Sequence, residues 1–310
     1  MQTDHALGTI AVVGCGLIGA SWAALFLAHG YRVTAWDPSE ESRHTFRDRI
    51  ALPLSQLHEL DNSLKGSTDS LNVFDTLADA VRQADFVQEN APEKTPLKRA
   101  LYAEIIQSAP EHAIISSSTS SLTWSDLSAE LPDKGRLITA HPFNPPHLMP
   151  LVELFAANPA IGKIAEDFYA SLARDVVILK KDAVGHIANR LSSALWREAV
   201  NIVAEGIADV SAVDRALVSG PGLRWSVVGS HMAYHLGGGE GGIRHYLQHL
   251  GPSQESRWKT LGNPKLTQEV CQLLIEGVLA EANGKSIAEL EAARDAGLLS
   301  ILKTKGNTDV

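Results

Sequence analysis

The stretch TIAVVGCGLIGASWAALFLA, at residues 9–28, decides the fold of this chain. It begins with β-branched and apolar residues that favour a buried strand, continues with glycines in the pattern GxGxxG, and ends in an apolar run that favours a helix. A second strand at 31–36 follows and leads into Asp37. Glycine-rich turns are common, but one placed between a strand and a helix predicts a βαβ unit that binds a dinucleotide.

Each glycine of this turn has a separate physical role. Gly14 permits the tight turn, Gly16 lets backbone amides approach a pyrophosphate, and Gly19 lets the helix pack closely on the strand. The positive end of the helix dipole favours the same phosphates. Asp37 can accept hydrogen bonds from both ribose hydroxyls and would repel a 2′-phosphate, so we predict NAD as the cofactor. A plain βαβ turn without a ligand is the alternative.

Composition narrows the class of protein. A chain of 310 residues exceeds one usual core, so we expect two domains. The net charge of −9 argues against nucleic acid or an anionic membrane surface as a partner. Two cysteines cannot build a disulfide framework, the first residues do not resemble a signal peptide, and no apolar run approaches the roughly 20 residues of a membrane span. We therefore predict a cytoplasmic protein.

The first half of the chain alternates β-rich runs with amphipathic helices. The further predicted strands are 85–88, 113–116, 136–140, 150–155 and 176–179. This alternation predicts a mainly parallel, Rossmann-type sheet that is covered on both faces. From Asp182 the spacing of apolar residues becomes helical, beginning with a long helix at 184–207. The predicted fold is α/β, with an NAD-binding domain at 1–182 and an all-helical substrate and dimerisation domain at 183–310.

The long predicted helix carries two apolar faces. Leu191 and Leu195 belong to one face, and Trp196, Val200 and Val203 to the other. A small domain buries one such face easily and two with difficulty. The core of the domain or a subunit interface could cover the second, and we predict a homodimer.

A nicotinamide enzyme that oxidises an alcohol needs a group to take the hydroxyl proton, and histidine suits this task near neutral pH. Among 12 histidines, His141 stands out because it ends a predicted strand in TAHPFNPPHLMPLVEL. Glu153 lies on the next strand, beyond a proline-rich turn. A carboxylate beside an imidazole fixes its tautomer and orients it, so this pair is our candidate general base. A purely structural hydrogen bond between the two is the alternative.

Four motifs in order, GxGxxG, STSSL at 118–122, HPFNPPHLMPLVE at 141–153 and ANR at 188–190, resemble the L-3-hydroxyacyl-CoA dehydrogenase superfamily over essentially the whole chain. The resemblance implies that His141 and Glu153 are the catalytic dyad, that Ser120 contacts the substrate oxygen, and that Asn189 polarises the same group. It also implies cofactor contacts from Leu17, Ile18, Asp37, Glu93 and Lys98. Ser118 would lie near the nicotinamide, although family members often carry asparagine there.

Local sequence leaves other roles open for two of these residues. The hydroxyl cluster SSSTSSLTW at 116–124 follows a strand and could simply cap the next helix, but ligands of open α/β sheets bind at this end of the strands. Asn189 could likewise be a capping or solvent-facing amide of the long helix. Its position, two residues from Ile187, turns it away from the apolar stripe and fits the lining of a cleft.

Charge separates two classes of substrate. The segment 38–80 contains four basic and eight acidic residues, which makes it a poor surface for coenzyme A.

The stretches SGPGLRWSVVG at 219–229 and LEAARDAGLLSILKTKG at 290–306 resemble the branch that contains L-gulonate 3-dehydrogenase (λ-crystallin) and L-carnitine dehydrogenase. That resemblance implies a small 3-hydroxy carboxylate, whose carboxylate Arg224 would bind unless it is a surface arginine. Trp225 and Tyr234 are either core aromatics or part of a cation–π site.

The function that we predict is NAD-dependent, reversible oxidation of the 3-hydroxyl of a small L-3-hydroxy carboxylic acid to the 3-keto acid. A 3-hydroxyacyl-CoA dehydrogenase acting on short-chain thioesters is the alternative enzyme, and a catalytically idle NAD-binding protein is the alternative of another class.

Two histidine pairs, His231/His235 and His245/His249, have a spacing that can bind zinc. No third ligand is evident near them and hydride transfer needs no metal, so we predict no metal site.

Overall fold

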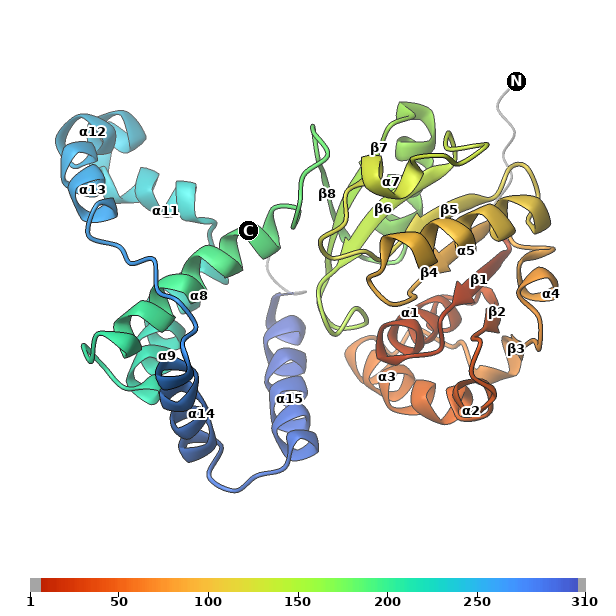
Figure 1. Cartoon of the computed structure of the whole chain (residues 1–310), viewed down its shortest axis with the longest axis horizontal. Coiled ribbons are helices and arrows are strands. Elements are labelled where there is room, and N and C mark those ends of the chain that lie inside the picture. The colour runs from red at the N-terminus through yellow and green to blue at the C-terminus, as the bar shows by residue number, and fades with distance from the viewer. Residues whose placement is uncertain (1–6, 306–310) are drawn as a thin grey trace. The chain divides into compact units, whose positions relative to one another are not determined.

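The protein, described by a computed structural model over residues 7–305, contains an eight-stranded sheet (Figure 1). Residues 1–6 and 306–310 lie outside the described part of the chain. The strand order is β3-β2-β1-β4-β5-β6-β7-β8. The strands are β1 (Thr9–Val13), β2 (Arg32–Trp36), β3 (Leu71–Val73), β4 (Phe86–Glu89), β5 (Ile114–Ser117), β6 (Leu137–Pro142), β7 (Leu151–Ala156) and β8 (Asp175–Ile178). Only the pair β6 and β7 is antiparallel among the described strands, so the predicted mainly parallel sheet is confirmed.

Alternate residues of each central strand enter two cores, one on each face of the sheet. In β1, Ile10 and Val12 join one core and Ala11 and Val13 join the other. The first core includes residues of α1 (Leu17–Ala28), α3 (Phe46–Leu60) and α7 (Pro159–Ser171). The second includes residues of α4 (Leu77–Val81), α5 (Thr95–Ser108) and α6 (Trp124–Ser128). Burial on both faces explains why β1 is apolar from Ile10 to Val13 and why β4 and β5 begin with apolar residues.

The described chain divides into two compact units. The first contains Asn189 and the described residues before it, with the residues from Gly297 onward. The second is 190–296 and is helical, which confirms the all-helical C-terminal part of the predicted fold. Its helices are α8 (Ala188–Ala204), α9 (Val210–Ser219), α10 (Pro221–Trp225), α11 (Ser230–Gly237), α12 (Gly242–His249), α13 (Gly251–Trp258), α14 (Gln268–Ala282) and the first part of α15 (Ile287–Lys305).

The structure corrects the limits of the long helix and adds a strand. The helix expected at 184–207 is α8, which begins only at Ala188 because Gly185 and His186 have positive φ angles of 75° and 49°. It ends before Gly206, whose φ is also positive. The added strand, β3, has three residues and is too short to show an alternating pattern. Across residues 7–305, no helix combines the length and the apolar character needed to cross a bilayer.

Candidate functional site

The glycine loop lies at the carboxyl end of β1, where the strand order reverses between β1 and β4. Gly14 has a φ of 101°, and a Cβ there would lie 3.0 Å from the backbone of Asn90. A Cβ on Gly19 would lie 1.9 Å from the carbonyl oxygen of Gly14, so helix and loop approach too closely for any side chain. A Cβ on Gly16 would meet nothing within 4 Å. The loop thus has open space beside its backbone at the N-terminus of α1, which fits a pyrophosphate.

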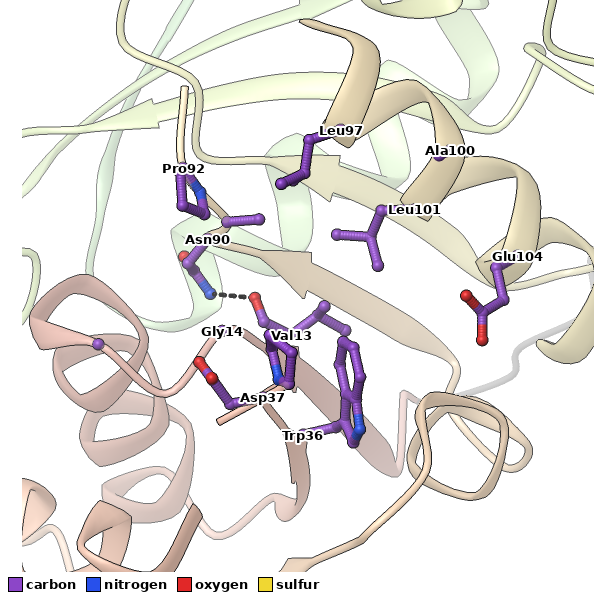
Figure 2. Close-up of a pocket in the computed structure, with 13 residues that line it drawn as sticks. Val13, Gly14, Trp36, Asp37, Asn90, Pro92, Leu97, Ala100, Leu101 and Glu104 are labelled. Atoms are coloured by element: carbon purple, nitrogen blue, oxygen red, sulfur yellow. Dashed lines mark hydrogen bonds between the residues drawn. The ribbon is translucent and has the colours of Figure 1, made fainter. Parts of the chain in front are cut away.

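A cavity of about 610 Å³ adjoins this loop (Figure 2). It is lined by Gly14, Gly16 and Asp37, by Trp36 of β2, and by apolar side chains of α5. Figure 2 shows Trp36 facing Leu101 across the space, an arrangement that suits a flat base between two apolar walls. Asp37 accepts hydrogen bonds from the amides of Cys15 at 2.8 Å and Ser39 at 2.9 Å, which holds its carboxylate at the loop.

A second cluster forms where β6 and β7 pair. The antiparallel register sets His141 directly opposite Glu153, and Nδ1 of the imidazole lies 2.9 Å from Oε2 of the carboxylate. Both are buried, with 5% and 1% of their surface exposed. The other carboxylate oxygen, Oε1, accepts hydrogen bonds from the amides of Ile187 at 2.7 Å and Ala188 at 2.9 Å. Glu153 therefore orients the imidazole and caps the start of α8 at the same time.

The electrostatics of Glu153 keep it ionised. Burial alone would raise its pKa, but hydrogen bonds from His141 and from the two amides of α8 lower it below the ordinary value for glutamate. A carboxylate in this position makes Nδ1 of His141 the protonated nitrogen and leaves Nε2 free to accept a proton. The geometry is that of an imidazole prepared to act as a base.

Asn189 and Ser120 lie on the Nε2 side of His141. The amide nitrogen Nδ2 of Asn189 donates to the carbonyl oxygen of Ser120 at 3.0 Å and lies 3.4 Å from Nε2 of His141. The structure thus brings together the four residues that the resemblance implied as catalytic, and α8 places the asparagine because its first turn is fixed by Glu153. A hydroxyl bound beside Nε2 would meet one basic nitrogen and the amide of Asn189, while the hydroxyl of Ser120 donates to Oε1 of Glu93 at 3.2 Å.

Glu93 organises the hydroxyl cluster, a role that its sequence position did not reveal. Its Oε1 accepts hydrogen bonds from the amides of Ser120 at 2.7 Å and Ser121 at 3.0 Å, and from the hydroxyl of Thr119 at 2.6 Å. Burial would raise the pKa of Glu93, but these donors and the charge of Lys98 lower it. The carboxylate therefore fixes the turn that carries Ser120.

Two more of the expected cofactor contacts, Lys98 and Ser118, form hydrogen bonds within the protein, whereas Leu17 at the start of α1 is 77% exposed. Lys98 is buried, with 1% exposed, and its amine donates to both carboxylate oxygens of Glu89 at 2.7 and 3.0 Å. Ser118 donates to Oδ1 of Asn90 at 2.7 Å and accepts from Gln88 at 2.8 Å. Lys98 thus fixes the end of β4 through Glu89, and Ser118 links the end of β5 to Asn90, which follows β4.

Arg224 belongs to the second unit, in the last turn of α10, with an exposed side chain. Trp225 and Tyr234 are 40% and 43% exposed, so neither is a core aromatic of the chain as described. The ring of His245 contacts His249 with centroids 4.2 Å apart, and Nδ1 of His235 accepts from the amide of Ile243. Among residues 7–305, no group of three or more histidine, cysteine or acidic side chains is placed to hold a metal ion.

Comparison with protein families gives two adjoining matches. Residues 9–183 match the NAD-binding domain of 3-hydroxyacyl-CoA dehydrogenase, and residues 185–287 match its C-terminal domain. Similar proteins include the L-carnitine dehydrogenase of Streptomyces griseus subsp. griseus, which is 44% identical over 300 residues covering 96% of this chain and 90% of that protein. The L-carnitine dehydrogenase of Pseudomonas sp. is 38% identical over 303 residues, covering 97% and 94%.

Solved structures agree on the fold. An NAD⁺-dependent 5-formyl-3-hydroxy-2-methylpyridine 4-carboxylic acid 5-dehydrogenase superposes with a TM-score of 0.82 at 24% identity, over 98% of this chain and all of that one. The (S)-3-hydroxybutyryl-CoA dehydrogenase of Ralstonia eutropha superposes with a TM-score of 0.61 at 25% identity, over 68% of this chain and 77% of that one.

Proposed function

The chain belongs to the 3-hydroxyacyl-CoA dehydrogenase family and is an NAD-dependent oxidoreductase of CH–OH groups, and from this premise we propose that it oxidises L-carnitine. The identity to L-carnitine dehydrogenases over nearly the full length of both chains is the observation that carries the proposal. The excess of acidic residues in 38–80 supports a small acid over a coenzyme A thioester, and the thioester alternative is the less supported one.

Four residues of the first unit would perform the proton transfer. His141 takes the proton of the 3-hydroxyl on Nε2, because Glu153 holds the proton of Nδ1 and stabilises the imidazolium that forms. Asn189 and the hydroxyl of Ser120 hydrogen-bond the same oxygen and fix it in front of the base. NAD⁺, when bound, would accept the hydride that leaves the carbon carrying the 3-hydroxyl. The same groups act in reverse when the keto acid is reduced.

Residues around the glycine loop would hold the cofactor. Gly14, Gly16 and the amides of Leu17 and Ile18 would bind the pyrophosphate at the start of α1, and the lack of a side chain at Gly19 lets the helix approach the loop. Asp37 would accept both ribose hydroxyls, and Ser118, Glu93 and Lys98 complete the set that we assign to cofactor binding.

L-Carnitine carries a carboxylate and a trimethylammonium group on either side of its alcohol. Arg224 is our candidate for the carboxylate, since a guanidinium binds it through two parallel hydrogen bonds. Trp225 and Tyr234 are candidates for the cation, because aromatic faces attract quaternary ammonium groups.

We further propose that the enzyme is a cytoplasmic homodimer assembled through its helical domain, without nucleic acid or membrane partners. Leu191 and Leu195, on one apolar face of α8, are 65% and 38% exposed in the single chain, whereas Val200 of the other face is 2% exposed. An apolar helix face left open in this way is typical of a subunit interface.

A turnover panel tests the proposed function directly. NADH formation is measured with L-carnitine, L-gulonate, L-3-hydroxybutyrate and L-3-hydroxybutyryl-CoA, each with NAD⁺ or NADP⁺. We expect kcat/KM to be highest for L-carnitine with NAD⁺. A higher kcat/KM for the thioester than for every free acid would overturn the proposal, and a preference for L-gulonate would keep the reaction but reject the substrate.

A further inference from the structure

A second imidazole lies against the face of His141. His186, in the segment between β8 and α8, is 3% exposed, and its ring centroid lies 4.9 Å from that of His141 with the planes 25° apart. Phe143 meets His141 with its edge, at 5.9 Å and 72°. The base is thus bounded by a flat ring on one face, an aromatic contact at another side, and Glu153 at Nδ1.

The backbone holds His186 in this place at a cost in stability. Its φ of 49° is left-handed, a conformation that is unfavourable for a non-glycine residue. Gly185 before it is also left-handed, at 75°, and the amide of Ile187 after it is held by Glu153. Neighbours on both sides therefore fix the ring position, so the stack does not depend on a flexible side chain finding its partner.

The chemistry of the His186 ring adds a second cost. Within the described residues its Nδ1 is buried and has no hydrogen-bond partner, which is unfavourable because folding removes the nitrogen from water without replacing that hydrogen bond. Burial, and then the proximity of His141, lower the pKa of His186, while Glu153, a hydrogen bond with the backbone of Ser120, and Asp182 raise it. The net direction is downward, so the ring is neutral near pH 7. A strained backbone and an unpaired nitrogen beside the proposed base direct attention to a role for this residue in the active site.

We propose that His186 is a positioning residue, whose ring face holds the plane of His141 so that Nε2 points at the substrate hydroxyl. The bond from Nδ1 to Glu153 anchors one edge of the imidazole but allows the ring to rock about that bond. The 3.4 Å approach of Asn189 is too long to stop this motion. A stacked ring does stop it, because aromatic faces in contact resist tilting. The inference rests on the proposed role of His141 as the base.

The test compares three substitutions. His186→Phe keeps a flat ring, His186→Leu keeps apolar volume without one, and His186→Gln keeps a polar group without one. We expect kcat to fall about 10- to 100-fold for His186→Leu and His186→Gln, and to stay within about threefold for His186→Phe. The KM for NAD⁺ should change less than about twofold in all three, since His186 does not line the cofactor cavity.

Stability separates positioning from a structural role. Both His186→Phe and His186→Leu remove the unpaired Nδ1 together with the hydrogen bond that the ring makes with the backbone of Ser120. These effects oppose each other, so the melting temperature of both variants should stay within about 3 °C of that of the wild type. His147→Leu is the matched control: His147 is also buried, at 4%, but its nitrogens bond Ser21 and Gln56. We expect His147→Leu to lower the melting temperature while kcat per folded enzyme stays within about twofold.

A spectroscopic readout follows the base itself. The low-field proton resonance of the Nδ1–H of His141, hydrogen-bonded to Glu153, should persist in His186→Phe and broaden or vanish in His186→Leu as the ring rocks. The inference would be overturned by wild-type kcat in His186→Leu. It would also be overturned if His186→Gln kept wild-type kcat while His186→Phe lost it. His141→Ala keeps the two questions apart: if it stays active, the proposed base is wrong, and if it is inactive while His186→Leu is fully active, only the role of His186 fails.

Discussion

Replacing Glu153 with glutamine should inactivate the enzyme without unfolding it. The glutamine side chain has the same shape, but one oxygen becomes an NH₂ donor. In the wild type Oε1 accepts from two backbone amides and Oε2 faces Nδ1 of His141. The amides of Ile187 and Ala188 can only donate, whereas an imidazole can change its tautomer. The glutamine oxygen will therefore stay on the amides, and the NH₂ will force Nδ1 to become an acceptor. The remaining proton then sits on Nε2, where the substrate proton has to be received.

The size of the loss follows from this arrangement. To act as a base, His141 must return to the tautomer in which Nδ1–H faces the glutamine NH₂, which sacrifices one hydrogen bond and leaves a buried donor unpaired. Those two penalties amount to about 2–4 kcal/mol, or roughly 30- to 10³-fold in kcat. Loss of the negative charge that stabilises the imidazolium acts in the same direction. The cap of α8 survives, so the melting temperature should fall little.

The assay is steady-state NADH formation with the best substrate of the panel, together with thermal unfolding. Glu166→Gln, on the partly exposed face of α7, serves as the matched control and should keep wild-type kcat. His141→Ala should lose at least about 10²-fold in kcat, and the double variant with Glu153→Gln should be no slower, because the glutamate acts through the histidine. A kcat within threefold of the wild type for Glu153→Gln, or a double variant far slower than His141→Ala, would refute the reasoning.

The acid stability of the same variant gives an independent reading. The pKa of Glu153 is lowered in the folded state, so its contribution to stability is present above the unfolded pKa and is lost as pH falls through the folded one. The free energy of unfolding of Glu153→Gln should therefore fall less steeply than that of the wild type in the acid range. Parallel acid profiles for the two proteins would contradict the assigned protonation state.

Three further predictions concern cofactor, substrate and assembly. Asp37→Ala should weaken NAD binding and reduce the preference for NAD over NADP, measured as the ratio of kcat/KM values; an unchanged ratio would reject the ribose contact. Arg224→Met should lower kcat/KM for the best free acid by roughly 30- to 1000-fold, with partial recovery in Arg224→Lys, and a loss below threefold would reject the carboxylate contact. Light scattering at micromolar concentration should give twice the 33.3 kDa mass of the chain, and a monomeric mass would refute the dimer.

Local patterns in the sequence were sufficient to predict the sheet and the nucleotide end of the fold. The strand at residues 9–13, the glycines after it and Asp37 all lie within one βαβ unit, so spacing along the chain carries the information. His141 and Glu153 are also near in sequence, because a single turn joins their antiparallel strands. The strand β3 was missed since three residues carry too little pattern.

Contacts between distant segments could not be predicted in the same way. Nothing in the spacing connects Glu93 with the turn at 119–121, or His186 with His141, because these contacts depend on how loops from different strands end at one edge of the sheet. The start of α8 was misplaced for the same reason. Apolar periodicity continues through 184–187, but the left-handed residues and the carboxylate that caps the helix are features of the folded chain.

The position of the helix start also explains how one carboxylate can assemble most of this site. Glu153 binds both His141 and the first amides of α8. A single side chain therefore fixes the position of the base and of Asn189, which faces it. The left-handed segment that precedes the helix then sets His186 on the face of the same imidazole. A helix that began four residues earlier, as the apolar pattern favoured, would leave Oε1 without its amides and His141 without its stacked ring. Function at this site therefore depends on where α8 begins, which is fixed by tertiary contacts more than by helix propensity.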